Sequence, residues 1–459
     1  MADFIYTGGA FRSGVAMFVD ENGLIARFSE AEADRARALR LGGRAILPGL
    51  VNAHSHAFQR LIRGRTEHRT RAQRDTFWTW RESMYSAANL ISPDIMYTAA
   101  RMAFLEMLAG GITTVGEFHY VHHGAGGVSY QNRNQLALEV LRAARDTGLR
   151  VALLRAAYVR AGYERAMHPA QLRFITPRVE DFKADTEALR EEVATSGATG
   201  RAWVGVAPHS IRAVPLDYLA EVVRYARANR MPVHMHVAEQ PAEVEECVAE
   251  HGLPPIALLH EHGLLDSRFT AIHAIHVTDP EIDHLASARA MICACPITER
   301  NLGDGVAPAD RWAERGLGIA FGSDSNVQID LLEDARSLEY DLRMQRLERV
   351  VLSEDSSTGD LAKRLFASAT EVGAQSLGAR VGELEPGRPA DFFSVDLNDP
   401  SLAGATEESL LSHIVFAMAR TAVRDVCVGG EFVIRGGRHA QGQNIVRQFA
   451  AVQRELWSA

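Results

Sequence analysis

Short apolar runs recur through the middle of the chain and alternate with longer segments whose hydrophobic positions follow helical spacing. Short apolar runs between turn residues are typical of buried strands, and their alternation with helical segments is typical of βα units in a parallel sheet. The pattern predicts strands near residues 45–53, 112–118, 150–157, 202–207, 231–237, 270–276, 290–295 and 317–323. Eight such strands are what a closed (β/α)8 barrel requires.

Segments with helical periodicity lie between several of these runs. They cover residues 94–109, 134–147, 180–195, 216–229 and 241–250. Gly110-Gly111 and Gly148 stand where helix C-terminal caps are expected. We therefore predict an α/β fold in which residues 48–379 form a (β/α)8 TIM barrel.

The two ends of the chain show a different pattern. Residues 1–44 and the tail from about residue 380 contain short alternating segments, and Gly429-Gly430 lies between two of them, which indicates a β-hairpin. We predict that residues 1–47 and 380–459 together form a small composite β-sandwich, with a helix at the C-terminal end.

Composition and charge favour a small-molecule substrate. The chain has 459 residues, of which 47% are hydrophobic and 23% charged, close to ordinary globular usage. The net charge is -9 without a block of like charges, so neither nucleic acid nor a membrane surface is expected as a partner. No apolar stretch approaches the roughly 18 residues of a membrane span, and the N-terminus lacks a secretory pattern. We expect a soluble, cytoplasmic protein.

Cysteine and lysine usage limit the metal chemistry. Four cysteines are too few for a disulfide framework in a chain of this size, and Cys293 and Cys295 lie in an apolar run without a second pair, so we interpret them as structural. The only lysines are Lys183 and Lys363. Neither lies near a predicted strand end, so a carbamylated lysine between two metal ions is not expected.

Histidines and a carboxylate stand at the ends of several predicted strands. Residues i and i+2 of a strand point to the same side, so His54 and His56 can direct two imidazoles to one ion. His236 and Asp324 end two other apolar runs, and barrel enzymes collect their active sites at the C-terminal ends of the strands. We predict that these four residues bind one metal ion. His234 shares a side with His236, so spacing alone leaves both open, but His236 lies nearer the strand end.

Three residues are candidates for proton transfer. Glu239 follows the predicted ligand His236 by three residues and could shuttle protons, or it could cap or solvate the helix after it. His273 and His276 both stand near the end of the sixth run, with His273 nearer the strand end. Asp324 could accept a proton from a metal-bound water, or it could cap the segment that follows.

Taken together, these motifs resemble the amidohydrolase superfamily, specifically its one-metal deaminase branch. The resemblance covers nearly the whole chain. It is carried by Pro48-Gly49, His54-Ser55-His56, His236-Val237-Ala238-Glu239, His273, Cys295-Pro296, Gly322-Ser323-Asp324 and residues 382–391. It implies one Zn²⁺ per subunit, with Fe²⁺ or Mn²⁺ as alternatives, and a homodimer. It also implies catalytic roles for Glu239, His273 and Asp324.

Three more segments resemble members of this branch that hydrolyse N-formimino-L-glutamate to N-formyl-L-glutamate and ammonia in histidine breakdown. They are His56-Ala57-Phe58-Gln59-Arg60, Phe77-Trp78-Thr79-Trp80-Arg81 and Gly116-Glu117-Phe118-His119-Tyr120. This resemblance implies that the substrate is held by Gln59, Arg81, Tyr120, His209 and Arg212.

The chemistry of that substrate supports the two arginines independently. The substrate has two carboxylates, and a guanidinium group binds a carboxylate through two parallel hydrogen bonds. Arg81 and Arg212 could each bind one. The alternatives are a zinc-dependent deaminase of a purine, a pyrimidine or an adenosine derivative, and a metal-binding barrel without catalysis.

Overall fold

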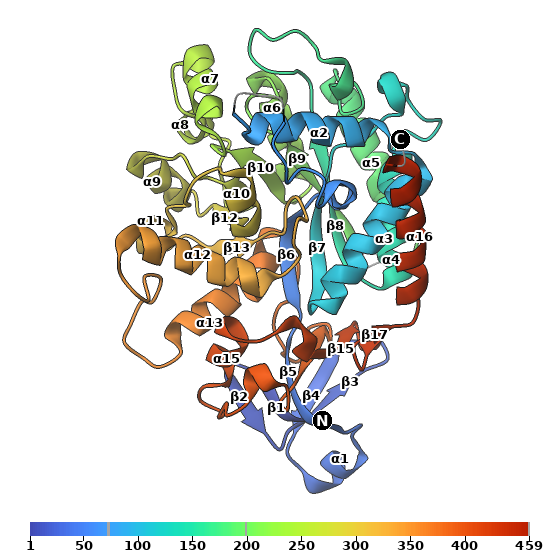
Figure 1. The fold of residues 1–459 in the computed structure, drawn as a ribbon, viewed down its shortest axis with the longest axis vertical. Coiled ribbons are helices and arrows are strands. Elements are labelled where there is room, and N and C mark those ends of the chain that lie inside the picture. Colours follow the sequence, from blue (N-terminus) through green and yellow to red (C-terminus); the bar gives the residue numbers. More distant parts are fainter. Residues whose placement is uncertain (71–73, 198–199, 458–459) are drawn as a thin grey trace.

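The computed structural model describes residues 1–70, 74–197 and 200–457. Its largest sheet has eight strands in the order β13-β12-β11-β10-β9-β8-β7-β6, and all neighbouring strands in this order are parallel. Figure 1 shows this sheet in the centre and upper part of the molecule, surrounded by helices. The strands are β6 (Leu50–Ser55), β7 (Ile112–His119), β8 (Arg150–Ala157), β9 (Ala202–Pro208), β10 (Val233–Val237), β11 (Phe269–His273), β12 (Met291–Ala294) and β13 (Ile319–Phe321). The predicted barrel is confirmed.

The barrel closes between its last and first strands, just beyond β13. Ser55 and Asp324 form a parallel β-bridge. The backbone N–H of Asp324 donates to the carbonyl of His54 at 3.0 Å, and the N–H of His56 donates to the carbonyl of Asp324 at 3.0 Å. The side chain of Asn52 accepts the backbone N–H of Ser323 at 3.0 Å. The seam of the barrel therefore runs through three of the predicted metal ligands.

The first predicted strand, residues 45–53, is wrong as a single element. β5 (Leu41–Pro48) pairs with strands of the other sheet, whereas β6 belongs to the barrel. The chain changes partners at Gly49, whose N–H donates to the carbonyl of Asp391, while the next N–H, of Leu50, donates to Gly111. A Cβ atom on Gly49 would lie 2.1 Å from Oγ1 of Thr113, so the close approach at this junction requires glycine.

The sixth and eighth strands are shorter than predicted. β11 ends at His273 because His273 and Ala274 have φ angles of +70° and +49°, which a strand cannot continue. The predicted run 317–323 forms a strand only over Ile319–Phe321. Both shortened ends lie next to the predicted site.

The helices predicted between the strands are confirmed. They are α3 (Pro93–Ala109), α4 (Gln135–Thr147), α5 (Val179–Thr195), α6 (Leu216–Ala228) and α7 (Pro241–His251). Gly148 ends α4 in the left-handed conformation, with φ +84°. Further helices are α1 (Glu32–Arg37), α2 (Phe77–Asn89), α8 (Pro255–Glu261), α9 (Asp279–Ser287), α10 (Pro296–Leu302), α11 (Ala309–Glu314), α12 (Leu331–Arg346), α13 (Asp360–Ala367), α14 (Gly373–Ser376), α15 (Leu410–Phe416) and α16 (Gly442–Trp457).

Both ends of the chain form one seven-stranded sheet, at the bottom of Figure 1. In order, its strands are β17 (Arg438–His439), β16 (Glu431–Arg435), β15 (Val423–Val428), β14 (Phe392–Asp396), β5, β1 (Ala2–Thr7) and β2 (Ala10–Ser13). A two-stranded sheet of β3 (Ala16–Val19) and β4 (Ile25–Ser29) accompanies it. Ile25 packs with Ile46, Phe392 and Cys427 in one buried cluster between the two sheets. The composite β unit from both termini is therefore confirmed.

Two local predictions at the C-terminal end also hold. Gly429 and Gly430 connect β15 and β16 with φ angles of +57° and +79°, as a tight hairpin turn requires. The terminal helix α16 lies beside α3 (Figure 1), where Arg101 donates to Gln448 at 3.0 Å and to Gln441 at 2.5 Å. Among the helices of the described ranges, none is both long and apolar enough to cross a membrane.

Candidate active site

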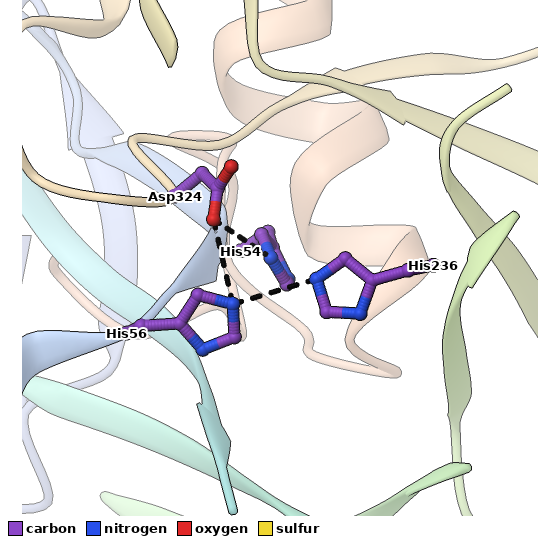
Figure 2. Close-up of side chains that lie close together, drawn as sticks. All are labelled: His54, His56, His236 and Asp324. Carbon is purple, nitrogen blue, oxygen red and sulfur yellow. Dashed lines mark hydrogen bonds and ion pairs between the residues drawn. The ribbon is translucent and has the colours of Figure 1, made fainter. Parts of the chain in front are cut away.

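Four side chains from three parts of the barrel meet at the C-terminal ends of its strands. Nε2 of His54 and Nε2 of His56 each lie 3.4 Å from Oδ1 of Asp324, and Nε2 of His56 lies 3.4 Å from Nε2 of His236. Figure 2 shows all four side chains pointing toward one another. One ligand atom from each lies within 4.8 Å of the others, and all four residues are buried. The structure thus brings together the four residues that the sequence predicts as metal ligands.

Backbone carbonyls orient two of the imidazoles. Nδ1 of His56 lies 2.9 Å from the carbonyl oxygen of Phe118, and Nδ1 of His236 lies 3.0 Å from that of His209. A carbonyl only accepts, so each Nδ1 carries the hydrogen and each Nε2 directs its lone pair into the cluster. Among the described residues, neither ring nitrogen of the fully buried His54 makes a hydrogen bond, and its Nε2 atom has only the 3.4 Å contact with Asp324. Such an orphaned polar group fits a metal ion as its missing partner.

The protonation states also suit a cation. Burial lowers the pKa of His54 to about 3 and places the pKa values of His56 and His236 below their ordinary value, so all three rings are neutral. Burial alone would raise the pKa of Asp324, but the surrounding histidines hold it below its usual range. Neutral imidazoles and an ionised carboxylate are the forms that bind metal.

His273 lies beside this cluster and is surrounded by carboxylates. Its Nε2 atom is 3.6 Å from Oε1 of Glu239 and 3.7 Å from Oδ2 of Asp324, while its Nδ1 atom is 3.1 Å from Oε1 of Glu299. Burial alone would lower the pKa of His273, but the three carboxylates raise it well above its ordinary value. The alternative, His276, points instead to the carbonyl of Asp304, at 2.8 Å.

Glu239 lies in the pocket and does not cap the following helix. The backbone N–H of Glu239 is accepted by the side chain of Glu243 at 3.2 Å, so Glu243 supplies the local hydrogen bond. Burial raises the pKa of Glu239 to about 7, against the opposing attraction of His273. A carboxyl group with this pKa can both hold and release a proton near neutral pH.

His234 and the cysteines take structural positions. Nε2 of His234 lies 2.8 Å from the carbonyl of Ser376, so this ring points away from the cluster and only His236 contributes to it. All four cysteines are buried free thiols. Cys295 lies close to His273 and Asp324, but burial raises the pKa of its thiol well above the ordinary value, which keeps it protonated.

A pocket opens onto the cluster and contains every residue predicted to hold the substrate. Aromatic and aliphatic side chains complete its wall. Its lining residues are His56, Gln59, Phe77, Trp80, Arg81, Met84, Tyr85, Tyr120, Tyr158, His209, Arg212, His236, Glu239, Leu302 and Asp324.

Two arginines in this pocket form no ion pair with any described residue. Nε and Nη1 of both Arg81 and Arg212 are buried without hydrogen-bond partners. Burial alone would lower the pKa of Arg212, and nearby groups that include Glu243 and Glu239 raise it, but neither carboxylate forms an ion pair with it. Both groups lie over the ring of Trp78, with their Cζ atoms 4.4 Å and 5.7 Å from its centroid. Arg212 is only 7% exposed. An unpaired charge at such a depth is costly, so the pocket is built to receive an anion.

The remaining predicted contacts are also placed at the pocket. Nε2 of Gln59 donates to the hydroxyl of Tyr120 at 2.9 Å, which leaves Oε1 of Gln59 without a partner. In the loop after β7, His122 and His123 face the carbonyls of Ala156 and Ile175 at 2.8 Å and 2.9 Å. Tyr120 is therefore the residue of this loop that lines the pocket.

Sequence reasoning missed Glu299, Tyr85 and Tyr158. Tyr85 stands four residues after Arg81 on α2, so the shared helix face was an available signal. Glu299 contacts His273 across 26 residues of sequence, and Tyr158 lies just beyond β8. No spacing rule connects either of them to the site.

A (β/α)8 barrel with histidine and carboxylate ligands gathered at the C-terminal ends of its strands defines a class of metal-dependent hydrolases. The chain belongs to the amidohydrolase family, whose model matches residues 45–433.

Individual relatives agree with this assignment. The chain is 39% identical over 442 residues to a formimidoylglutamate deiminase from Pseudomonas aeruginosa, covering 95% of each protein. It is 29% identical over 401 residues to a 5-methylthioadenosine/S-adenosylhomocysteine deaminase from Natronomonas pharaonis, covering 87% of this chain and 83% of that protein. The crystal structure of an amidohydrolase from Brucella melitensis superimposes with a TM-score of 0.91 at 34% identity, covering 99% of this chain and 98% of that one.

Proposed function

We propose that this protein hydrolyses N-formimino-L-glutamate to N-formyl-L-glutamate and ammonia, in the breakdown of histidine. The observation that carries the proposal is the pair of arginines, Arg81 and Arg212, whose buried Nε and Nη1 atoms have no hydrogen-bond partner, in the pocket that opens onto the four clustered residues. The substrate offers two carboxylates to these groups. The 39% identity with a protein named formimidoylglutamate deiminase supports the same reaction.

The ligand set suits one Zn²⁺ per subunit, held by His54, His56, His236 and Asp324. Imidazole and carboxylate ligands also accept Fe²⁺ or Mn²⁺. When bound, such an ion supplies the positive charge that lowers the pKa of a water molecule toward about 7. The homodimer implied by the family resemblance and the cytoplasmic location expected from the sequence pattern stay predictions.

The side chains around the cluster divide the proton transfers between them. Asp324 accepts a proton from the water as its oxygen bonds to the formimino carbon. The imidazolium of His273 donates a hydrogen bond to that oxygen and stabilises the charge that develops on it. Glu239 transfers a proton to the terminal nitrogen. The hydroxyl of the tetrahedral intermediate then loses its proton as its oxygen becomes the formyl carbonyl, the carbon–nitrogen bond breaks, and ammonia leaves. Both protons of the water end on the ammonia, and Asp324 and Glu239 return to their starting states.

Substrate binding falls to other residues that line the same pocket. Arg81 and Arg212 bind the carboxylates, and Gln59, Tyr120 and His209 contact the formimino group or the chain next to it.

A ring deaminase is the alternative on the same metal chemistry. Guanine and cytosine have no carboxylate, and S-adenosylhomocysteine has only one. Binding a neutral ring would leave the Nε and Nη1 atoms of Arg81 and Arg212 without a hydrogen-bonded anion, which disfavours this alternative.

The test is ammonia release by the purified, zinc-loaded protein from N-formimino-L-glutamate, guanine, cytosine and S-adenosylhomocysteine in parallel. Release from N-formimino-L-glutamate alone, with competitive inhibition by glutarate, supports the proposal. Release only from a ring compound, or bound zinc with no release from any of the four, would overturn it.

A further inference from the structure

Three polar side chains beside the pocket have no role in the reaction described above. Nε2 of Gln171 lies 3.0 Å from the hydroxyl oxygen of Tyr85 and 2.7 Å from that of Tyr158. The two hydroxyl oxygens are 3.5 Å apart. All three residues are buried, with Gln171 2% exposed and Tyr158 1% exposed. Both tyrosines line the pocket, whereas Gln171 stands behind them.

The arrangement leaves at least one phenolic hydrogen unused. An amide nitrogen carries two hydrogens and accepts none, so Gln171 donates to both phenol oxygens. Each tyrosine therefore keeps its own hydrogen for another acceptor. At 3.5 Å the contact between Tyr85 and Tyr158 is at the limit of a hydrogen bond, and it can use only one of the two hydrogens. Within the described part of the chain, neither hydroxyl has another acceptor.

The unused phenolic hydrogen lies near the guanidinium groups of Arg81 and Arg212, which are proposed to bind a carboxylate. The guanidinium carbon of Arg81 is 5.4 Å from the centroid of the Tyr85 ring, and Tyr158 shares the pocket wall with Arg212. Burial raises the pKa of Tyr158 above its ordinary value, with Tyr85 adding to the effect, so the phenol stays protonated and can donate. A carboxylate has about four lone-pair sites, and a bidentate arginine fills two of them. Another donor can therefore bind the same group.

We propose that Tyr85 and Tyr158 form an additional part of the carboxylate-binding site and that Gln171 positions them by holding both phenol oxygens as acceptors. A substrate carboxylate bound by the arginines then receives a phenolic O–H as well. Tyr85, Tyr158 and Gln171 thereby favour the dianionic substrate over molecules that lack the contacted carboxylate. This inference rests on the proposed function and names further residues that determine its specificity.

The decisive variant is Gln171→Glu, because it reverses the direction of the hydrogen bonds. A carboxylate at position 171 accepts from both tyrosines, so neither phenolic hydrogen remains for the substrate. Tyr85→Phe and Tyr158→Phe remove one hydroxyl each at nearly constant volume. Tyr218→Phe is the matched control, since this tyrosine is also buried and its hydroxyl donates to the carbonyl of Thr176 at 3.1 Å, outside the pocket.

Binding is measured by calorimetry with N-formyl-L-glutamate, which separates recognition from turnover. N-formylglycine and 4-formamidobutyrate serve as probes that each lack one of the two carboxylates. A hydrogen bond to a charged group corresponds to about tenfold or more in affinity. We expect at least that loss for Gln171→Glu and for one of the two phenylalanine variants, and no loss for Tyr218→Phe. The probe that lacks the contacted carboxylate should be insensitive to the same variants.

Kinetics supply a second readout that a purely structural role would not produce. KM for N-formimino-L-glutamate should rise by a larger factor than kcat falls, a split that a loss of stability alone would not produce. Wild-type affinity in Gln171→Glu, or in the double variant Tyr85→Phe/Tyr158→Phe, would overturn the inference. If instead the wild-type protein binds N-formyl-L-glutamate no better than the two monoacids and releases no ammonia from N-formimino-L-glutamate, the proposed function itself fails.

Discussion

Glu299 holds His273 by its Nδ1 atom, at a distance of 3.1 Å, and the same carboxylate oxygen accepts the backbone N–H of Cys295 at 2.9 Å. This contact fixes the ring so that Nε2 faces Asp324 and Glu239. It also supplies part of the negative charge that keeps His273 protonated.

Replacing Glu299 by glutamine removes this charge at constant shape, so the pKa of His273 should fall. We expect kcat to decrease by about 10–100-fold, the usual effect of removing an outer hydrogen-bond partner, with little change in KM or metal content. Steady-state kinetics measure kcat and KM, and metal analysis measures the metal content. Glu281→Gln is the control, because Glu281 is equally buried but caps helix α9 through Thr278. It should lower the melting temperature without affecting kcat, and equal losses of kcat in the two variants would contradict the role of Glu299.

Glu239→Ala tests the proton transfer to the leaving nitrogen. The variant should retain its metal, because Glu239 is not among the four clustered ligands. Its kcat should fall by about 10²–10⁴-fold, the usual contribution of general acid–base catalysis. Metal content and ammonia release measured on the same sample decide the matter. Full activity in a metal-replete variant would exclude Glu239 as the proton carrier.

Arg212→Ala should act mainly on binding. If the carboxylate contact is equally strong in the ground state and the transition state, its loss raises KM and leaves kcat nearly unchanged. Loss of one charged hydrogen-bonded contact predicts a rise in KM of about tenfold or more. Arg224, whose side chain is 67% exposed on helix α6, provides a control variant that should behave as wild type. A fall in kcat at constant KM would assign Arg212 to the reaction instead.

Removal of the metal should abolish activity and reduce stability together. A chelator removes the ion that His54, His56, His236 and Asp324 are proposed to bind. Because a ligand that binds only the folded protein stabilises it, removing this ion lowers stability. We expect ammonia release to stop and the melting temperature to fall, with both restored by added Zn²⁺. Unchanged turnover by protein shown to be metal-free would refute a metal-dependent reaction.

Glu117 gives a prediction for stability against pH. Burial raises its pKa in the folded protein to about 8, against an ordinary value of 4.5. Between these values the native state holds a proton that the unfolded chain releases, so the contribution of Glu117 to stability is fully present below pH 4.5 and is lost as the pH rises through 8. Relative to Glu117→Gln, the wild-type free energy of unfolding should decrease by at most about 1.4 kcal/mol per pH unit. Melting curves of both proteins from pH 5 to pH 8 test this, and parallel pH profiles would contradict it.

The barrel and the four clustered ligands could be predicted from the sequence because both depend on local patterns. Apolar runs mark buried strands, and His54, His56, His236 and Asp324 stand where those runs end. Topology alone then brings such strand ends to one face.

The parts that could not be predicted depend on contacts between distant segments. The switch at Gly49 arises because Pro48 pairs with Phe392 whereas Leu50 pairs with Ile112, and nothing within the run itself distinguishes the two partners. Likewise, Glu299 and Gln171 are polar residues that act only through the residues they touch. Tertiary packing determines which residues they contact, and no periodic pattern in the sequence indicates those contacts.

The seam between Ser55 and Asp324 has a consequence for how the molecule acquires activity. Asn326 strengthens it by donating to the carbonyl of His56 at 3.0 Å and to the hydroxyl of Ser55 at 3.2 Å. The ligands on the first barrel strand therefore meet their carboxylate partner only when a segment about 270 residues later in the chain has docked. During synthesis the catalytic centre therefore cannot form before Asp324 has been made, and a chain that has not yet closed its ring has no site at which to react.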